Sequence, residues 1–161
     1  MARTLIGLKT DAAPDKDKKS DMDHDNYPEN YTKDILTSVK TIAVVGASPK
    51  EERPSYGVSK TLIAKGHKVH PVNPGFAGKE ILGRPVSPNL AAVPEPIDMV
   101  DIFRNSEAAG EVVDEALKLD PLPKVIWMQL GVRNDEAAKR AEARGVKVVM
   151  DRCPAIEYRK F

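Results

Sequence analysis

The sequence has one cysteine, few aromatic residues and no excess of either charge. Cys153 stands alone among 161 residues, which excludes an intramolecular disulfide framework and gives no zinc-binding spacing. Lysine and arginine total 25 against 24 aspartate and glutamate, so no broad basic field would attract nucleic acid or a membrane surface. No apolar run reaches the length of a membrane span or of a signal peptide's hydrophobic region. These absences predict a cytoplasmic protein that binds neither nucleic acid nor membrane and holds no metal.

Large aliphatic side chains are also nearly missing from residues 9–30, which mix Asp, Lys, Pro and Asn. Such a segment cannot bury enough apolar surface to offset the entropy lost on ordering. We therefore expect residues 1–30 to be a disordered charged tail. Residues 31–161 are then expected to form one domain, because a chain of this length can bury a core of its own.

From residue 31 onward, short β-branched runs alternate with segments of helical periodicity. Five runs predict strands, at residues 41–45, 67–72, 98–103, 124–130 and 146–150. Helical spacing predicts helices at residues 55–65, from Ser106 to Leu117 and at residues 135–144. Residues 73–96 are rich in Gly and Pro and predict a loop with one helical turn at residues 89–93. This alternation predicts an α/β fold of the Rossmann type, a doubly wound five-stranded parallel sheet with strand order 3-2-1-4-5.

Ligands of such sheets lie beyond the carboxyl ends of the strands, where the strand order reverses. With the expected order, the strands at residues 41–45 and 124–130 flank that point. Small or polar residues stand at these strand ends and are candidate site residues: Gly46, Ala47, Ser48, Asn73, Pro74, Phe103, Arg104 and Gln129.

The loop after the first strand, VGASPKEERPSYG, resembles a phosphate-binding turn. Gly46 would make the tight turn, and Ser55 and Tyr56 would open a helix whose positive end favours an anion. Arg53 would add a charge-assisted contact. The loop does not match the G-x-G-x-x-G pattern of dinucleotide sites, because Ala47 follows Gly46 and the loop is longer. From this loop alone, an ordinary strand-to-helix turn is an open alternative.

The end of the second strand bears on the choice of nucleotide. Dinucleotide sites usually place Asp or Glu there to hold the ribose hydroxyls, whereas this sequence has Asn73 followed by Pro74. A neutral turn with Lys79 nearby would accept a ribose that carries a 3′-phosphate, which a carboxylate would repel. NAD is therefore disfavoured, although an ordinary turn explains Asn73 and Pro74 equally well.

Seven stretches in order carry a family resemblance that spans residues 35–158: TIAVVGAS, RPSYGV, HPVNP, GKEILG, IDMVDIFRNSEAA, WMQLGV and VVMDRCPAIE. They resemble the stand-alone CoA-binding proteins of bacteria and archaea, which are similar to the N-terminal domain of the succinyl-CoA synthetase α subunit. The resemblance implies that CoA binds across the strand ends. It places the CoA phosphates at Gly46, Ala47, Ser48, Arg53, Ser55 and Tyr56, the adenosine along Val72, Asn73, Pro74 and Lys79, and the pantetheine arm toward Phe103, Arg104 and Gln129.

The resemblance does not extend to the synthetase chemistry. Those relatives use a phosphorylated histidine on a second domain, for which this sequence has no counterpart. His24 lies in the expected tail, while His67 and His70 bracket the second strand with no acid or nucleophile paired to them by motif. Cys153 has two interpretations, a thiolate favoured by the neighbouring Arg152 or a small buried core residue. We expect no catalytic residue and no ligase activity.

Three hypotheses for function result. The first is a binding protein for CoA or acyl-CoA that acts as a sensor, a carrier or a subunit of a larger assembly, with a protein partner or further copies of itself. The second is an NAD(P)-binding oxidoreductase, which Asn73 and the missing glycines disfavour. The third is a scaffold with a decayed nucleotide site, which the intact loop around Gly46 and Arg53 disfavours.

Overall fold

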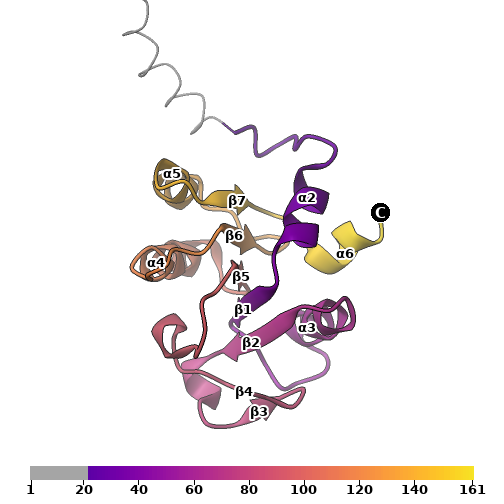
Figure 1. The fold of residues 1–161 in the computed structure, drawn as a ribbon, viewed down its shortest axis with the longest axis vertical. Coiled ribbons are helices and arrows are strands. Elements are labelled where there is room, and N and C mark those ends of the chain that lie inside the picture. Colours follow the sequence, from indigo (N-terminus) through magenta and orange to yellow (C-terminus); the bar gives the residue numbers. More distant parts are fainter. Residues whose placement is uncertain (1–21) are drawn as a thin grey trace, which may run out of the picture.

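A computed structural model describes residues 22–161 as a parallel sheet with helices on both faces (Figure 1). The sheet has the order β2-β1-β5-β6-β7. Its strands are β1 (Thr41–Val45), β2 (Lys68–Val72), β5 (Met99–Ile102), β6 (Val125–Met128) and β7 (Lys147–Val149). The expected five-stranded parallel α/β fold of the Rossmann type is confirmed.

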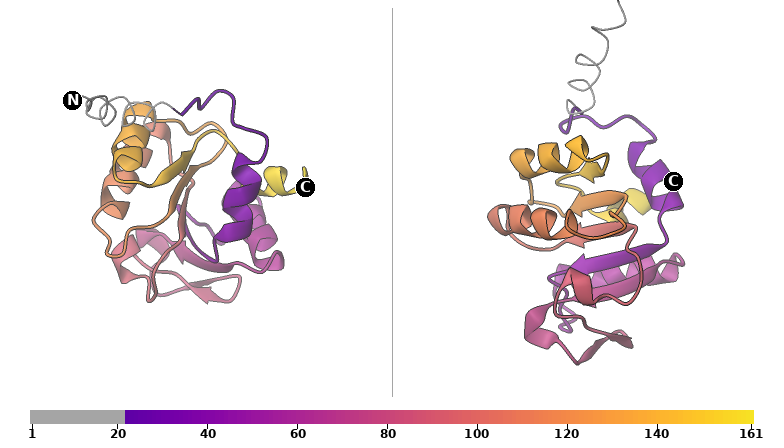
Figure 2. Two further views of the ribbon diagram at one scale, coloured as in Figure 1. Left: turned by 45° about the horizontal axis from the view of Figure 1, so that its top comes forward. Right: turned by 60° about the vertical axis from the view of Figure 1, so that its left-hand side comes forward.

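Two layers of helices enclose the sheet (Figure 2). One face is covered by α4 (Ser106–Ala116) and α5 (Asp135–Ala143), and the other by α2 (Tyr31–Ser38), α3 (Pro54–Ala64) and α6 (Pro154–Tyr158). Asn105 and Asn134 cap α4 and α5 by accepting hydrogen bonds from the amides three residues later. None of the helices in residues 22–161 is long and apolar enough to cross a membrane.

The 3-2-1-4-5 pattern is present, but a different segment occupies its third place. Ser87 pairs in parallel with Val72, and its amide donates to the carbonyl of Pro71 at 3.0 Å, so a very short extended segment adds to the outer side of β2. Strand β5, which the sequence analysis counted as third, lies between β1 and β6. The order therefore reverses between β1 and β5. A pairing around a single residue is too short to show strand periodicity in the sequence.

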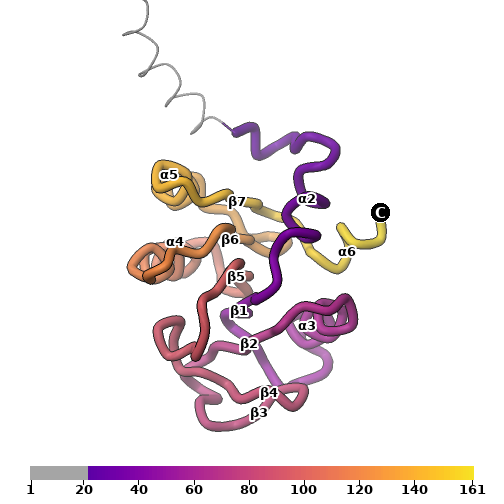
Figure 3. The backbone as a smooth tube through the Cα atoms, viewed as in Figure 1, coloured from indigo at the N-terminus to yellow at the C-terminus, as the bar shows by residue number. Residues whose placement is uncertain are grey.

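The segment between β2 and β5 forms small elements beside the edge of the sheet (Figure 3). It contains the 3₁₀ turns η1 (Pro74–Phe76) and η2 (Leu90–Ala92) and an antiparallel hairpin of β3 (Glu80–Ile81) with β4 (Arg84–Pro85). The helical turn expected near residues 89–93 is confirmed by η2.

Residues 22–30, the described part of the expected tail, contact the domain. The Tyr27 hydroxyl accepts a hydrogen bond from the Met150 amide at 2.8 Å, and its ring stacks on Tyr31. His24 Nε2 lies 3.1 Å from the carboxylate of Glu142. The rest of the expected tail, residues 1–21, lies outside the described residues.

Candidate functional site

A pocket of about 940 Å³ lies at the carboxyl end of the sheet, within the range of about 300–1,000 Å³ usual for small-molecule sites. The loops after β1, β5 and β6 line it, together with α3 and α6. Most of the predicted site residues are among its lining: Gly46, Ser48, Arg53, Ser55, Asn73, Phe103, Arg104 and Gln129. Residues far apart in the sequence therefore meet at the point where the strand order reverses.

The other five predicted site residues do not line this pocket. Ala47 and Val72 are buried in the core, and their carbonyl oxygens accept hydrogen bonds from the Asn73 side chain and the Gly46 amide. Tyr56, in the first turn of α3, is half-buried against the core, whereas Pro74 and Lys79 are exposed at the edge of the sheet next to the hairpin. These last two residues flank the site.

Gly46 lies where the loops after β1 and β5 meet. Its φ of 87° lies in the left-handed region that side chains rarely adopt, and its amide donates to the carbonyl of Val72 at 2.9 Å. A Cβ atom at this position would lie 2.5 Å from the carbonyl oxygen of Phe103. Only glycine allows the loops after β1 and β5 to approach this closely.

Serine hydroxyls organise the loop between β1 and α3. The Ser48 amide donates to Ser55 Oγ at 3.2 Å, and the Lys50 amide donates to Ser48 Oγ at 3.1 Å. The amides of Ser48 and Lys50 are thus used within the loop and are not free to bind an anion. The remaining features that favour an anion are the first turn of α3 and the side chains of Lys50 and Arg53.

Asn73 joins the loops after β1 and β2. Its Nδ2 donates to the carbonyl of Ala47, and its Oδ1 accepts from the Gly75 amide, both at 2.9 Å. These bonds give the side chain a structural role in shaping the pocket. Because residue 73 is an asparagine, the end of β2 has no carboxylate that could bind ribose hydroxyls, as the sequence indicated.

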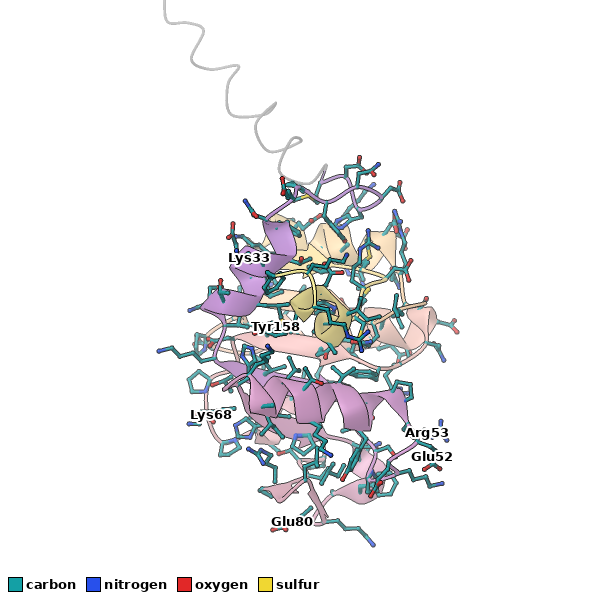
Figure 4. All side chains as sticks on the ribbon, turned by 90° about the vertical axis from the view of Figure 1, so that its right-hand side faces the viewer. Lys33, Glu52, Arg53, Lys68, Glu80 and Tyr158 are labelled. Atoms are coloured by element: carbon teal, nitrogen blue, oxygen red, sulfur yellow. The ribbon has the colours of Figure 1, made fainter. Side chains whose placement is uncertain are left out.

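The charged side chains that line the pocket are all positive. Lys50, Arg53, Arg104 and Arg159 line it, and no aspartate or glutamate does. None of these four cations forms an ion pair with a carboxylate of residues 22–161. Figure 4 shows Arg53 at the N-terminal end of α3. A ligand with several negative charges matches this wall.

The part of the pocket lined by the loop after β6 and by the start of α6 is apolar, and most of this apolar end was missed by the sequence analysis. It is formed by Leu130 and Val132 after β6 and by Cys153, Ala155 and Ile156 at α6. A helix of five residues has too few positions to show a period of 3.6, so no signal predicted α6.

Gln129 follows β6 and directly precedes Leu130 of the apolar end. Its side chain lines the pocket, although the residue exposes only 6% of its surface. Its Oε1 atom has no hydrogen-bond partner among the described residues. A buried amide of this kind is available to pair with a polar group of a ligand.

Asp101 is a second buried polar residue that the sequence analysis did not single out. It lies fully buried in β5 between Val44 and Trp127, and neither carboxylate oxygen has a partner among residues 22–161. Burial raises the pKa of this carboxyl well above its usual range, which favours the protonated form. Strand alternation places it on the same face as α3 and α6.

The three histidines have partners outside the pocket. His24 contacts Tyr27 and Glu142, His67 Nε2 lies 2.6 Å from the Tyr158 hydroxyl, and His70 contacts Glu95. Burial lowers the pKa of His67. None of these contacts brings a histidine into the pocket lining.

The side chains of Cys153 and its neighbour Arg152 lie in different surroundings. Cys153 is 8% exposed and lines the apolar end of the pocket. The Arg152 guanidinium lies 5.0 Å from the centre of the Tyr27 ring and donates to the carbonyl of Asp151. Arg152 therefore stabilises the N-terminal segment, a contact that the sequence did not indicate.

Comparisons with curated proteins identify relatives of this chain. The model of the CoA binding domain family matches residues 40–159. The uncharacterized protein YneT of Bacillus subtilis is 40% identical over 126 residues, which cover 78% of this chain and 90% of YneT. The ADP-forming acetate–CoA ligase I of Archaeoglobus fulgidus is 30% identical over 122 residues, which cover 71% of this chain but 18% of the ligase.

Solved structures of small proteins share the fold. A hypothetical protein from Pyrococcus horikoshii has a TM-score of 0.78 and 38% identity, and the match covers 84% of this chain and 93% of that one. A protein from Thermus thermophilus has a TM-score of 0.77 and 35% identity, with 83% and 98% covered. Since the family model spans both sides of the pocket and most of the sequence, this protein belongs to the CoA-binding domain family.

Proposed function

We propose that this protein binds CoA in the pocket at the strand ends and has no ligase chemistry of its own. The observation that carries the proposal is the set of four cations on the pocket wall, with no acidic side chain beside them. CoA carries a diphosphate and a 3′-phosphate, so its charge complements this wall. The proposed role of the protein is that of a sensor, a carrier or a subunit of a larger assembly.

The arrangement of the loops supports one orientation of the ligand. The diphosphate lies against Lys50, Arg53 and the first turn of α3, where charge and helix dipole act together. The adenosine extends toward Asn73, Pro74 and Lys79 at the edge of the sheet. The pantetheine arm runs past Phe103, Arg104 and Gln129 in the other direction.

A titration with four nucleotides tests the ligand. At about 100 times its Kd, CoA is expected to raise the Tm by roughly 5–10 °C, because it binds only the folded state. Dephospho-CoA, NAD and NADP should give smaller shifts, since each lacks either the 3′-phosphate or the pantetheine arm. A shift with NAD or NADP equal to that with CoA would contradict the proposal and favour the oxidoreductase hypothesis.

A substitution at Arg53 tests the placement of the diphosphate. Arg53→Ala should weaken CoA binding by about tenfold or more, because a charged hydrogen-bond donor is lost, and should leave the Tm of the free protein unchanged. Arg144→Ala is the matched control, an exposed arginine before β7 at the opposite edge of the sheet. Calorimetric titration measures both, and equal Kd values for the two variants would move the diphosphate away from this loop.

A further inference from the structure

The apolar end of the pocket carries unusual exposed surface. Among residues 22–161, the large apolar side chains that are exposed are Leu130 at 55%, Ile156 at 38% and Phe161 at 44%. Leu130 and Ile156 line the same end of the pocket, whereas Phe161 lies outside it. Apolar side chains gathered in a concave site indicate an apolar ligand group that covers them.

Gln129 supplies a polar group next to this apolar end. Its amide is buried, lines the pocket and has an Oε1 atom without a partner in the described part of the chain. A primary amide offers both a donor and an acceptor, which together match another amide or a carbonyl group. The pantetheine arm of CoA has two amides, and a thioester adds a carbonyl oxygen.

The register of the sheet places Gly46 and Gln129 at nearby strand ends. Val45, Ile102 and Met128 lie side by side on β1, β5 and β6, so Gly46 and Gln129 end strands that are two positions apart. Neighbouring strands are about 4.8 Å apart, which separates the two strand ends by about 10 Å. Helix α6 packs against α2 and α3 on one face of the sheet, and its Ile156 lines the same pocket as Gln129.

The cationic loop, the Gln129 amide and the apolar surface line one pocket, and they match the diphosphate, the pantetheine arm and the acyl group of an acyl-CoA. We infer that the pocket prefers CoA thioesters with an apolar acyl chain over free CoA, and that Leu130 and Ile156 contact the chain. This inference rests on the proposed function. The cationic loop and the apolar end line one pocket, which favours a single long ligand over a second copy of this chain as the group that covers Leu130 and Ile156.

Dissociation constants for CoA and for its acetyl, butanoyl and hexanoyl thioesters test the inference with the full chain. The Kd should fall by about two- to fourfold for each added methylene until the apolar end is filled. The double variant Leu130→Ser, Ile156→Ser should flatten this dependence on chain length. Phe161→Ser, a matched change at an exposed apolar residue outside the pocket, should retain the wild-type dependence.

Each other outcome has a definite meaning. CoA binding with no gain from the acyl chain would overturn this inference and leave the proposed function standing, whereas no binding of CoA or any thioester would overturn both. Succinyl-CoA and butanoyl-CoA have acyl chains of equal length. Tighter binding of succinyl-CoA would indicate that Arg159 binds a ligand carboxylate at this end of the pocket and would overturn the preference for an apolar chain. A wild-type dimer that the double variant converts to monomer would assign Leu130 and Ile156 to an interface between copies.

Discussion

The two faces of the sheet differ in what they bury. Beneath α4 and α5 the buried side chains are apolar, mainly alanine and valine at helical spacing. Beneath α2, α3 and α6 the core contains Trp127 and Cys153, and the helices add buried polar side chains such as Thr32, Ser55 and Glu157. The pocket opens on this second side.

The first face mainly stabilises the fold, whereas the second face also supplies groups that a ligand can contact. An apolar face of small side chains packs closely and costs no desolvation of polar groups. The second face buries polar groups that need partners, and Asp101 and Gln129 lack some of them within residues 22–161. The polar and apolar groups that a ligand can contact are therefore concentrated on one side of the sheet.

The largest effect is expected at Gly46, where the second face meets the strand ends. Gly46→Ala should lower the free energy of unfolding by about 3–5 kcal/mol, because backbone strain at positive φ adds to the overlap with Phe103. Gly145→Ala is the matched control, since Gly145 also has a positive φ but no atom near its absent Cβ. It should cost about 1–2 kcal/mol. Urea unfolding measures both, and equal losses would show that the contact with Phe103 is unimportant.

A smaller effect is expected from the N-terminal segment, which packs on the outside of the second face. A chain that begins at Tyr31 should lose about 1–3 kcal/mol, because the buried amide of Met150 loses the Tyr27 hydroxyl. A chain that begins at Met22 should match the full chain, as the composition of residues 1–21 predicts.

These two truncations place the boundary of the dispensable segment. We now propose that boundary near residue 22, whereas the sequence alone predicted it at residue 30. Equal stability of both truncated chains would restore the boundary at residue 30.

The smallest effect, and one that depends on pH, is expected at Asp101. Its pKa is raised in the folded state, so the folded protein keeps a proton that the unfolded chain releases. Stability from this carboxyl is therefore fully present below its ordinary pKa of 3.8 and is lost as the pH rises toward the folded value. Asp101→Asn should remove this loss and make the variant more stable than the wild type at neutral pH.

Thermal unfolding between pH 4 and pH 8 measures the effect, with Asp114→Asn, an exposed residue of α4, as the control. A wild-type advantage that grows with pH would contradict the protonated state of Asp101.

Much of the site was predictable because it depends on local chain features at strand ends. Gly46 and the helix that Ser55 opens follow from a β-branched run, a glycine and a helical period, all within a few residues. Asn105 and Asn134 are likewise local signals of helix starts. The missed elements, α6 and the pairing at Ser87, are too short to produce a period.

The sequence by itself determined the alternation of strands and helices, and with it the α/β class and the edge of the sheet that holds the site. The tertiary structure decided which strands are neighbours, because pairing partners are selected by contacts between distant segments rather than by local periodicity. It also decided the character of the pocket. Gln129, Leu130 and Ile156 line one pocket only when β6 and α6 are brought together. Burial, which no local pattern records, raises the pKa of Asp101 and leaves Gln129 Oε1 without a partner among residues 22–161.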